Sequence, residues 1–342
     1  MKNIKTIDLV HSYLKYPLPE GFLKELSREL KCINFYPSGG KYETLCQTLA
    51  EYSRVKIENI LPANGSDEVI EMITRAYPQM ILIPTPTFSQ YEASAVRGGF
   101  SRILVNCLEN GQYSIKYSTK QLKKASLVWI CNPNNPTGST IDREVILDIL
   151  KNTKGMVAVD ECNYNYSGES MVDLIHEFPN LIISRSFSKD FGLAGLRLGY
   201  MISNPQNITQ ISTYGQYFRV NRIAEKSAEI VLRYLNYFQE AWEAIKVTRD
   251  SFIEQLRDLK FKVFNSKSNF VCIEFKNKDQ TKDFWNYLRK NGVFATAAWE
   301  DEFSVLKPCF VRICIGEKQE MVRVIEILSA YKYPSYNRTI HD

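Results

Sequence analysis

A single lysine, Lys189, stands among small hydroxyl residues in the segment Ser184-Arg-Ser-Phe-Ser-Lys-Asp-Phe-Gly-Leu-Ala-Gly-Leu-Arg-Leu-Gly-Tyr200. A lysine amine can form a Schiff base with a carbonyl group, and pyridoxal phosphate is anchored in this way. The phosphate of such a cofactor needs hydroxyls, backbone N–H groups and an arginine fork, which Ser186, Ser188 and Arg197 would supply. Taken alone, the segment also fits a surface loop, so the interpretation depends on the rest of the chain.

The segment Ala63-Asn-Gly-Ser-Asp-Glu-Val-Ile70 indicates the start of a helix. Asn-Gly favours a turn, and Ser66 or Asp67 can cap the helix that follows. The free N–H groups of a helix N-terminus bind phosphate, so this segment is a second candidate for the phosphate site. A capped helix without a ligand accounts for the same residues.

A turn of eight residues, Cys131-Asn-Pro-Asn-Asn-Pro-Thr-Gly138, directly follows a short apolar segment that is typical of a buried strand. Its two Asn-Pro pairs favour extended backbone before each proline. The side-chain amide of Asn135 is then available to a ligand at the strand end. A purely structural loop is the alternative.

Two residues are candidates for contact with an aromatic cofactor ring. Asp160 ends the apolar part of Val157-Ala-Val-Asp-Glu161, and a buried acid is costly unless it is paired. A pyridinium N–H would be such a partner, and keeping that nitrogen protonated makes the ring an electron sink. Phe88, in Pro84-Thr-Pro-Thr-Phe-Ser-Gln-Tyr91, could stack on the ring. The alternatives are a helix cap or salt bridge for Asp160 and a core position for Phe88.

The chain around these motifs alternates between short apolar runs and helical patterns. The apolar runs are typical of buried parallel strands and cover 80–83, 101–105, 127–131, 156–159 and 181–184. Helical patterns at 66–76 and 140–151 lie between some of them, which predicts an α/β domain with a mostly parallel sheet between helices. Ligands bind at the carboxyl ends of the strands in such folds, and the motifs fall there.

The later part of the chain has a different pattern. A long helical stretch, broken or continuous, is expected over 221–258, followed by short strands and two helices over 261–331. This order predicts a smaller α+β domain. We therefore divide the chain into an N-terminal arm at 1–29 that packs with the small domain, a large cofactor-binding domain at 30–220 and a small domain at 221–342.

Composition limits the functional classes. The 342 residues carry a formal net charge of +5 without a basic block, so binding of nucleic acid is not predicted. The eight cysteines contain no C-x-x-C pair and the three histidines lie far apart in sequence, so no metal site is predicted. The sequence shows no signal peptide and no apolar run of about 18 residues, which predicts a cytoplasmic protein without a membrane span.

The order of these motifs resembles that of the fold-type-I pyridoxal-phosphate enzymes of the class I and II aminotransferases, and most closely the histidinol-phosphate aminotransferase branch. Threonine-phosphate decarboxylase is a near relative of that branch. The resemblance runs from about residue 30 to residue 325 and rests on Gly-Ser-Asp-Glu, Pro-Thr-Phe, Asn-Pro-Asn-Asn-Pro-Thr-Gly, Val-Asp-Glu and Ser-Lys-x-Phe-Gly-Leu-Ala-Gly-Leu-Arg-Leu-Gly-Tyr. These motifs are specific for the cofactor and the fold, and much less specific for the substrate.

The resemblance implies a role for each motif residue. Lys189 anchors pyridoxal 5'-phosphate as a Schiff base and later shuttles a proton. Asp160 pairs with the pyridine nitrogen, Asn135 bonds the ring hydroxyl and Phe88 stacks on the ring. The residues implied to hold the phosphate region are Ser66, Asp67, Ser186, Ser188, Arg197 and Tyr36, of which Tyr36 reaches the cofactor phosphate of a neighbouring subunit.

Three further residues are candidates for binding the substrate. Arg312, in Phe310-Val-Arg-Ile-Cys-Ile-Gly316, resembles the family arginine that binds the substrate carboxylate, and a bidentate arginine suits that geometry. Taken alone, an arginine in a strand more often forms a structural ion pair. Arg219, in Gln216-Tyr-Phe-Arg-Val-Asn221, replaces a family asparagine in a loop near the partner subunit's active site. We hypothesise that Arg219, with Lys15, binds the distal phosphate or carboxylate of the substrate, and a solvated surface arginine is the alternative.

The chain departs from the family pattern at three places. Asn163 stands where the family usually has a tyrosine whose hydroxyl bonds the ring oxygen. An amide cannot ionise, so altered cofactor electronics are expected unless Tyr164 takes that role. No arginine stands at Thr296, where histidinol-phosphate enzymes usually carry a second one, so imidazoleacetol phosphate is disfavoured as the partner. The arm reads His11-Ser-Tyr-Leu-Lys-Tyr-Pro17 in place of the family's Asn-Glu-Asn-Pro.

These residues predict a pyridoxal-phosphate-dependent aminotransferase that moves an amino group from L-glutamate to a small phosphorylated ketone, for which dihydroxyacetone phosphate has a suitable size. The alternative is decarboxylation of an O-phospho amino acid, because the same fold and lysine serve both reactions. A cofactor-binding transcriptional regulator is disfavoured, because only about thirty residues precede the first matching motif. A nicotinamide dehydrogenase is disfavoured, because no early G-x-G-x-x-G is present.

Tyr36 and the loop that carries Arg219 also bear on assembly. If both complete the active site of a neighbouring subunit, the monomer is inactive, and we predict a two-fold homodimer with shared active sites. The expected partners are the small-molecule amino donor, the keto acceptor and a second copy of the chain, with no nucleic acid and no membrane.

Overall fold

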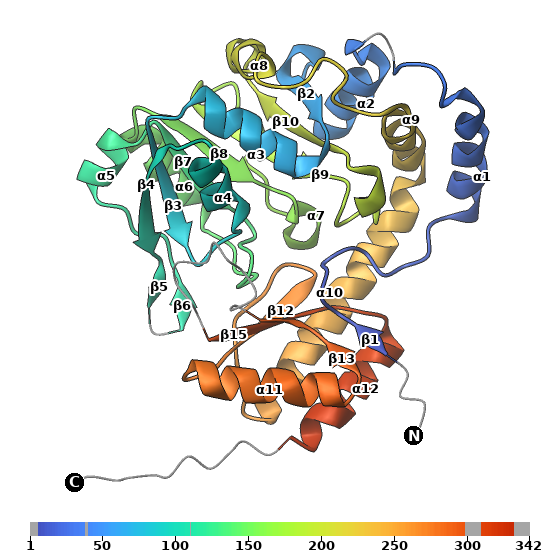
Figure 1. Cartoon of the computed structure of the whole chain (residues 1–342), viewed down its shortest axis with the longest axis vertical. Coiled ribbons are helices and arrows are strands. Elements are labelled where there is room, and N and C mark those ends of the chain that lie inside the picture. Colours follow the sequence, from blue (N-terminus) through green and yellow to red (C-terminus); the bar gives the residue numbers. More distant parts are fainter. Residues whose placement is uncertain (1–5, 38–39, 110, 298–308, 332–342) are drawn as a thin grey trace.

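A seven-stranded sheet forms the larger part of the molecule (Figure 1) in the computed structural model, which describes residues 6–37, 40–109, 111–297 and 309–331. Its strands are β2 (Ile60–Ala63), β3 (Met80–Thr85), β4 (Ser101–Asn106), β7 (Leu127–Cys131), β8 (Met156–Asp160), β9 (Leu181–Ser186) and β10 (Gly199–Ser203). They lie in the order β2-β10-β9-β8-β7-β3-β4. Each neighbouring pair is parallel except the two that involve β10. The predicted α/β fold with a mostly parallel sheet is confirmed.

Helices cover both faces of this sheet (Figure 1). They are α2 (Glu43–Ser53), α3 (Gly65–Ala76), α4 (Gln90–Arg97), α5 (Thr119–Lys124), α6 (Arg143–Asn152), α7 (Tyr164–Ser167) and α8 (Pro205–Ser212). Successive residues of a strand alternate between the two faces, so Ile81 and Ile83 pack with α3 and α4 while Leu82 packs in the cluster on the opposite face. Because both faces are covered, these strands are continuous apolar runs, which is the pattern that the sequence showed.

A second, antiparallel sheet forms the smaller part of the molecule. Its strands, in the order β11-β12-β15-β14, are β11 (Lys262–Val263), β12 (Phe270–Glu274), β15 (Phe310–Cys314) and β14 (Thr296–Ala297). The helices α11 (Lys278–Lys290) and α12 (Lys318–Ser329) belong to this part. Earlier in the chain, after β4, the short strands β5 (Leu108–Glu109) and β6 (Gln112–Tyr113) form an antiparallel pair. The strands expected over 261–275 and 310–314 are present.

The helical stretch expected over 221–258 is broken. It consists of α9 (Arg222–Val231), a 3-10 turn at Leu232–Tyr234 and the long helix α10 (Leu235–Asp258). α10 runs from the large sheet down to the small one (Figure 1). Further 3-10 turns lie at Leu30–Cys32, Ile57–Asn59, Val172–Leu174 and Ala194–Leu196.

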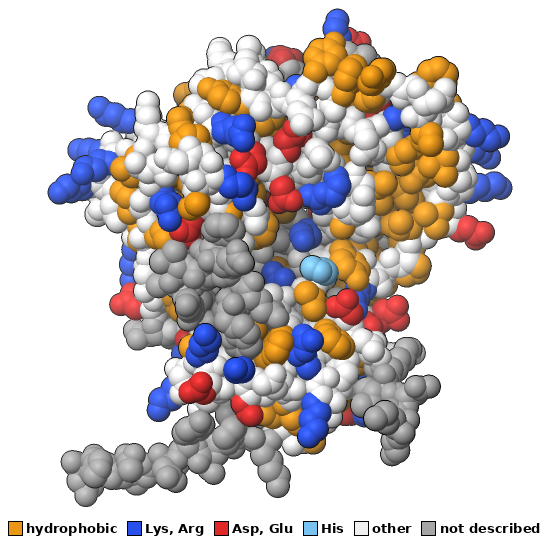
Figure 2. All heavy atoms as spheres, in the orientation of Figure 1, with side chains coloured by type: hydrophobic (Ala, Val, Ile, Leu, Met, Phe, Trp, Pro, Cys, Tyr) orange, Lys and Arg blue, Asp and Glu red, His pale blue; other side chains and the backbone are white. Residues whose placement is uncertain are grey.

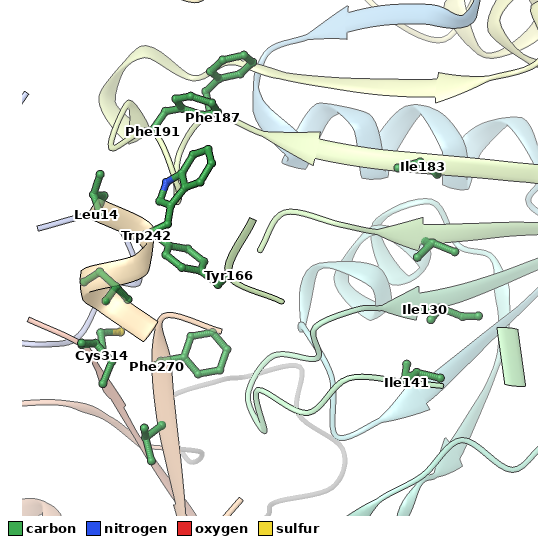
Figure 3. Packing of buried hydrophobic residues seen from close by; sticks show 14 of the residues in the cluster. Leu14, Ile130, Ile141, Tyr166, Ile183, Phe187, Phe191, Trp242, Phe270 and Cys314 are labelled. Atoms are coloured by element: carbon green, nitrogen blue, oxygen red, sulfur yellow. The ribbon is translucent and has the colours of Figure 1, made fainter. Parts of the chain in front are cut away.

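The hydrophobic core continues from the large sheet along α10 to the small sheet (Figure 3). Trp242 of α10 meets Phe191 edge to face with ring centroids 5.5 Å apart, and its indole N–H donates to the carbonyl of Asp190 at 2.7 Å. Phe270 of β12 lies at the far end of the same cluster. The chain that follows Lys189 is therefore held against α10 by apolar packing and by one buried hydrogen bond.

The N-terminal segment reaches both parts of the molecule. β1 (Ile7–Asp8) pairs in parallel with β13 (Val293–Phe294) next to the small sheet. The helix α1 (Glu20–Glu29) packs instead near α9, where Glu25 accepts a hydrogen bond from Tyr234 at 2.7 Å. The division of the chain at residues 29 and 220 stays a prediction, and its first five and last eleven positions (1–5 and 332–342) lie outside the described residues.

No helix among the described residues is both long and apolar enough to cross a membrane. No group of three or more His, Cys, Asp and Glu side chains among them is placed to hold a metal ion.

Candidate active site

A cavity of about 440 Å³ opens at the carboxyl ends of the parallel strands. Asp160 ends β8 and Cys131 ends β7, and the loops that follow β7 and β9 bring further polar residues to the same place. Nine of the residues predicted from sequence line it: Ser66, Asp67, Phe88, Asn135, Asp160, Asn163, Ser188, Lys189 and Arg197. The strand-end position expected for a ligand site in this fold is therefore where these side chains meet.

Lys189 carries an amine that is suited to nucleophilic attack. Burial lowers its pKa below the ordinary lysine value, and the nearby positive charge of Arg312 lowers it further. Its side chain forms no hydrogen bond or ion pair with another described residue, while its backbone carbonyl accepts from Leu14 N–H at 2.9 Å. A lowered pKa raises the fraction of neutral amine, which is the nucleophilic form.

Asp160 is held by two donors at the end of β8. The hydroxyl of Tyr91 donates to its Oδ2 at 2.7 Å, and the backbone N–H of Cys162 donates to its Oδ1 at 3.0 Å. Tyr91 is itself fixed by stacking on Trp129, with ring centroids 4.6 Å apart. Burial raises the pKa of Asp160, and a cationic partner beside it would favour the charged carboxylate. Tyr91 was given no role from the sequence, although it lies three residues after Phe88.

A phosphate cradle is formed where α3 begins beside Arg197. The guanidinium of Arg197 donates from Nη2 to Asp67 Oδ2 at 2.7 Å. Gly65 has φ of +76°, and a Cβ at that position would lie 2.7 Å from Arg197 Nη2. The approach of the arginine to the helix N-terminus thus requires glycine at residue 65. A helix N-terminus with an adjacent arginine is a suitable anion site.

Arg312 contacts the cavity through Asn135. Its Nη1 donates to Asn135 Oδ1 at 2.7 Å, and its Nη2 donates to the carbonyl of Val10 at 3.0 Å. Arg312 is half-buried on β15 and does not line the cavity itself, but its charge lowers the pKa of Lys189. The guanidinium therefore lies behind the cavity wall, within reach of an anion that binds beside Asn135.

Asn163 lines the cavity and carries a buried, unsatisfied acceptor. Its side chain is 6% exposed, and its Oδ1 is buried without a hydrogen-bond partner among the described residues. Tyr164 does not take its place, because its hydroxyl donates to the hydroxyl of Tyr52 at 2.7 Å and its ring lies 3.9 Å beneath the guanidinium of Arg185. The residue that faces the cavity is Asn163, as the departure from the family pattern implied.

Like Arg312, four other predicted residues do not line the cavity: Ser186, Lys15, Arg219 and Tyr36. The Ser186 hydroxyl accepts from the N–H of Ser188 at 3.1 Å. Lys15 pairs with Glu320 of α12 at 3.5 Å. Arg219 donates from Nε to the carbonyl of Gln216 at 3.0 Å, and Tyr36 stacks on Phe218 with ring centroids 4.5 Å apart.

Other cavity residues were not predicted from sequence: His11, Ser12, Tyr13, Cys131, Cys162, Ala194 and Gly195. The first three belong to the arm, where the sequence analysis noted only that the family pattern was missing. Cys131 and Cys162 are neighbours of predicted residues, and their position at the strand ends was the signal that could have included them.

A buried ion pair fixes the backbone that leads to Lys189. Arg185 of β9 donates from Nε and Nη2 to Glu161 Oε2 at 3.1 and 3.0 Å, and both side chains are almost fully buried. Glu161 also accepts from Met171 N–H at 2.7 Å. The ion pair joins the end of β8, which carries Asp160, to the end of β9, which leads to Lys189. Removing one partner of such a pair leaves the other charge buried without a partner.

Asp190, next to Lys189, is a buried acid without a cationic partner in contact. It accepts from the side-chain amide of Asn165 and, at 3.1 Å, from Phe191 N–H. Burial raises its pKa to about 7. Since the folded protein then binds a proton that the unfolded chain has released, stability falls as pH rises from about 4 to about 7 and is level above that.

Asp190→Asn is accordingly expected to raise the melting temperature, and to raise it more at about pH 8 than at about pH 5. The difference in unfolding free energy between the two pH values corresponds to about 2 kcal/mol. Thermal unfolding at both pH values measures it. Asp173→Asn is the control, because that side chain is 62% exposed and its ion pair with Arg143 contributes little. An equal shift for Asp190→Asn at both pH values would contradict the assigned pKa.

The donor set fits pyridoxal phosphate. Lys189 offers the amine for the aldehyde, Asp160 the carboxylate for a pyridinium nitrogen, and the start of α3 with Arg197 the phosphate cradle. The unsatisfied Oδ1 of Asn163 and the ring of Phe88 complete the wall. These residues would hold a phosphorylated aromatic aldehyde, and Asp160 would favour the protonated form of its ring nitrogen.

Comparisons with known proteins agree with this fit. The model of the family described as aminotransferase class I and II matches residues 7–328. The histidinol-phosphate aminotransferase of Thermoanaerobacter pseudethanolicus is 36% identical over 272 residues, which cover 77% of this chain and 77% of that protein. The solved histidinol-phosphate aminotransferase of Clostridium acetobutylicum matches with a TM-score of 0.85 at 27% identity, covering 94% of this chain and 98% of that one. The L-threonine-O-3-phosphate decarboxylase of Porphyromonas gingivalis shares the fold, with a TM-score of 0.82 at 24% identity and coverage of 94% and 98%.

Proposed function

Because the chain belongs to the family of class I and II aminotransferases, we propose that it transfers an amino group from L-glutamate to a small phosphorylated ketone the size of dihydroxyacetone phosphate. The protein is a fold-type-I, pyridoxal 5'-phosphate-dependent aminotransferase. The observation that carries the proposal is the unpaired amine of Lys189 in one cavity with Asp160, in front of Arg312.

Each residue has a defined task in the proposed reaction. Bound pyridoxal phosphate supplies an electron sink for the electrons of the substrate Cα–H bond. Lys189 would anchor the cofactor through its amine and would take up and return the proton at the substrate Cα. Asp160 keeps the pyridine nitrogen protonated, and the start of α3 with Arg197 holds the phosphate.

Arg312 orients the substrate by its carboxylate. Its Nη1 and Nη2 already bind the oxygen atoms of Asn135 and Val10, so two polarised N–H groups point to that side of the cavity. A carboxylate that joins or replaces these oxygens is fixed relative to Lys189. L-Glutamate, which carries this carboxylate, would be oriented by this side of the site.

An absorbance spectrum tests the proposed donor. The purified protein, loaded with pyridoxal phosphate, is expected to show the visible band of the bound aldehyde form. Adding L-glutamate should replace this band by the shorter-wavelength band of the amine form, and adding dihydroxyacetone phosphate should restore it. If glutamate leaves the band unchanged while phosphoserine or phosphothreonine releases carbon dioxide, the protein is a decarboxylase. Its activity would then match that of the L-threonine-O-3-phosphate decarboxylase whose fold it shares.

We propose a two-fold homodimer that shares its active sites across an apolar patch, defined here as Leu30, Ile33, Phe35, Tyr36, Tyr214, Tyr217 and Phe218. These side chains are between 40% and 75% exposed. Figure 2 shows hydrophobic side chains gathered on the side of the large domain that carries α1 and α9. Contiguous exposed apolar surface of this kind marks an interaction site.

The apolar patch also carries the residues that were expected to act on a neighbouring subunit. Tyr36 stacks on Phe218, which adjoins Arg219, so the two expected contributors lie together although they are far apart in sequence. Nη1 of Arg219 is buried and has no hydrogen-bond partner among the described residues. This placement supports the proposal that Tyr36 and Arg219 complete the partner's site, with Lys15 a weaker candidate because it is paired with Glu320.

Ile33→Asp is expected to convert the dimer to a monomer of low activity, because it places a charge within the apolar patch. Light scattering and amino-transfer activity measure the two effects. Val247→Asp is the matched control, since Val247 is 70% exposed on α10, outside the patch. A fully active monomer of the unaltered protein would rule out shared active sites.

A further inference from the structure

The N-terminal arm forms one wall of the cavity through three consecutive residues, His11, Ser12 and Tyr13. The chain around them is fixed at alternate positions. The anchoring hydrogen bonds are Arg312 Nη2 to Val10 O (3.0 Å), Thr296 Oγ1 to Val10 O (3.0 Å), Asn269 Nδ2 to Ser12 O (2.7 Å) and Leu14 N to Lys189 O (2.9 Å). Because Val10, Ser12 and Leu14 are tied to the protein through backbone atoms, the wall keeps its place whichever side chain stands at residue 11.

His11 is the residue of this wall that has no structural task. Its side chain is exposed, whereas Ser12 and Leu14, which follow it, are 4% and 5% exposed. The imidazole forms no hydrogen bond or ion pair with any residue in the described part of the chain. Figure 2 shows a histidine side chain beside basic side chains near the middle of this face. An exposed, unpaired imidazole on a rigid backbone is preorganised to bind a ligand.

The other basic groups of the described cavity wall already have tasks. Lys189 is the anchor, and Arg197 is paired with Asp67 at the phosphate cradle. Arg312, behind the wall, is engaged with Asn135 and Val10 and serves the substrate carboxylate. Within this chain's own cavity wall, His11 therefore remains as the basic side chain available for a second anionic group on the substrate, next to the hydroxyl-bearing residues Ser12 and Tyr13.

We propose that His11 binds the phosphate group of the amino acceptor and makes the enzyme prefer phosphorylated over unphosphorylated ketones. An imidazole N–H donates to a phosphate oxygen, and protonation adds an attractive charge. The inference deepens the proposed function, because it assigns a residue of this chain to the phosphate of the same substrate. It concerns the distal group alone, so it applies to a phosphorylated amino acid as well as to a ketone.

Binding of glycerol phosphate, compared with glycerol, tests the inference. Glycerol phosphate has neither a carbonyl nor an amine, so it occupies the phosphate subsite of the cofactor-loaded protein without reacting. We expect His11→Ala to weaken its affinity about 10- to 100-fold in calorimetric titration, the usual cost of losing a hydrogen bond to a charged group. His11→Asn should recover part of the loss because an amide can still donate. His176→Gln, an exposed histidine outside the cavity, should bind as the unaltered protein does.

A kinetic comparison adds a second readout. His11→Ala should raise the KM for dihydroxyacetone phosphate more than it lowers kcat, and should change the KM for dihydroxyacetone little. Equal affinity of the unaltered protein and His11→Ala for glycerol phosphate would refute the inference, as would a KM change of the same size for both ketones. Failure of glutamate to donate its amine would instead refute the proposed function, and the binding result would still stand.

Discussion

Lys189→Ala is expected to lower the rate of amino transfer by about 10⁴-fold, the upper range for a group that moves the reacting proton. The variant loses both the covalent anchor and the base that carries the proton. Steady-state rates with L-glutamate and dihydroxyacetone phosphate measure the effect. The absorbance spectrum should also lose the band of the anchored cofactor, although Asp160 and Arg197 remain to bind the cofactor without a covalent bond.

The fold should survive this change, because no described side chain depends on the Lys189 amine. Lys189 is tied to the N-terminal arm through its backbone carbonyl, which accepts a hydrogen bond from Leu14 N–H and is kept in the variant. Lys151→Ala, an exposed lysine at the end of α6, is the matched control and should retain full activity. A Lys189→Ala enzyme with a normal spectrum would show that another lysine anchors the cofactor.

Asp160→Asn is expected to lower kcat by about 10²- to 10³-fold, the typical loss for one preorganised electrostatic partner. An amide has the shape of the carboxylate, and its oxygen can accept from Tyr91 or from Cys162 N–H as Asp160 does. Packing should therefore be kept while the charge that holds the pyridine nitrogen protonated is lost. The measurement is kcat in steady state, together with the pH dependence of the cofactor band.

Tyr91→Phe provides a graded comparison. It removes the hydroxyl that donates to Asp160 Oδ2 but leaves the carboxylate and the stack on Trp129. Its effect on kcat should be smaller than that of Asp160→Asn, since the charge remains. If Asp160→Asn retained the full kcat, the pyridine nitrogen would have to be served by another group.

The inner parallel strands, β3, β7, β8 and β9, could be predicted from sequence because they are buried on both faces and are therefore largely apolar runs. β10 gave a weaker signal, since Gly199 and Tyr200 interrupt its apolar pattern, and its antiparallel direction is decided by pairing with β2 and β9. The direction of a strand is a property of its neighbours, so it could not be predicted from local pattern alone.

The candidate site was predictable where its residues occur in short motifs, and less so where distant segments meet. Lys189, Asp160 and Asn135 each stand in a motif whose local backbone aims them at a strand end. By contrast, Tyr91 meets Asp160 from 69 positions away, and Arg312 bonds to Val10 across 302 positions. Those contacts depend on how whole elements pack, and loop closure over such distances leaves no local sequence signature.

The arm that walls the cavity has a consequence for the order in which the protein becomes functional. Ile7 pairs with Val293, so the first described strand cannot pair until residues 286 positions later have been synthesised. At ordinary rates of translation this interval is on the order of tens of seconds. During that time the large sheet can fold on the ribosome, yet the wall containing His11 cannot be fastened, because Thr296 and Arg312 do not yet exist. A nascent chain should therefore acquire its cofactor cradle before its substrate wall, with activity appearing only after the C-terminal strands emerge.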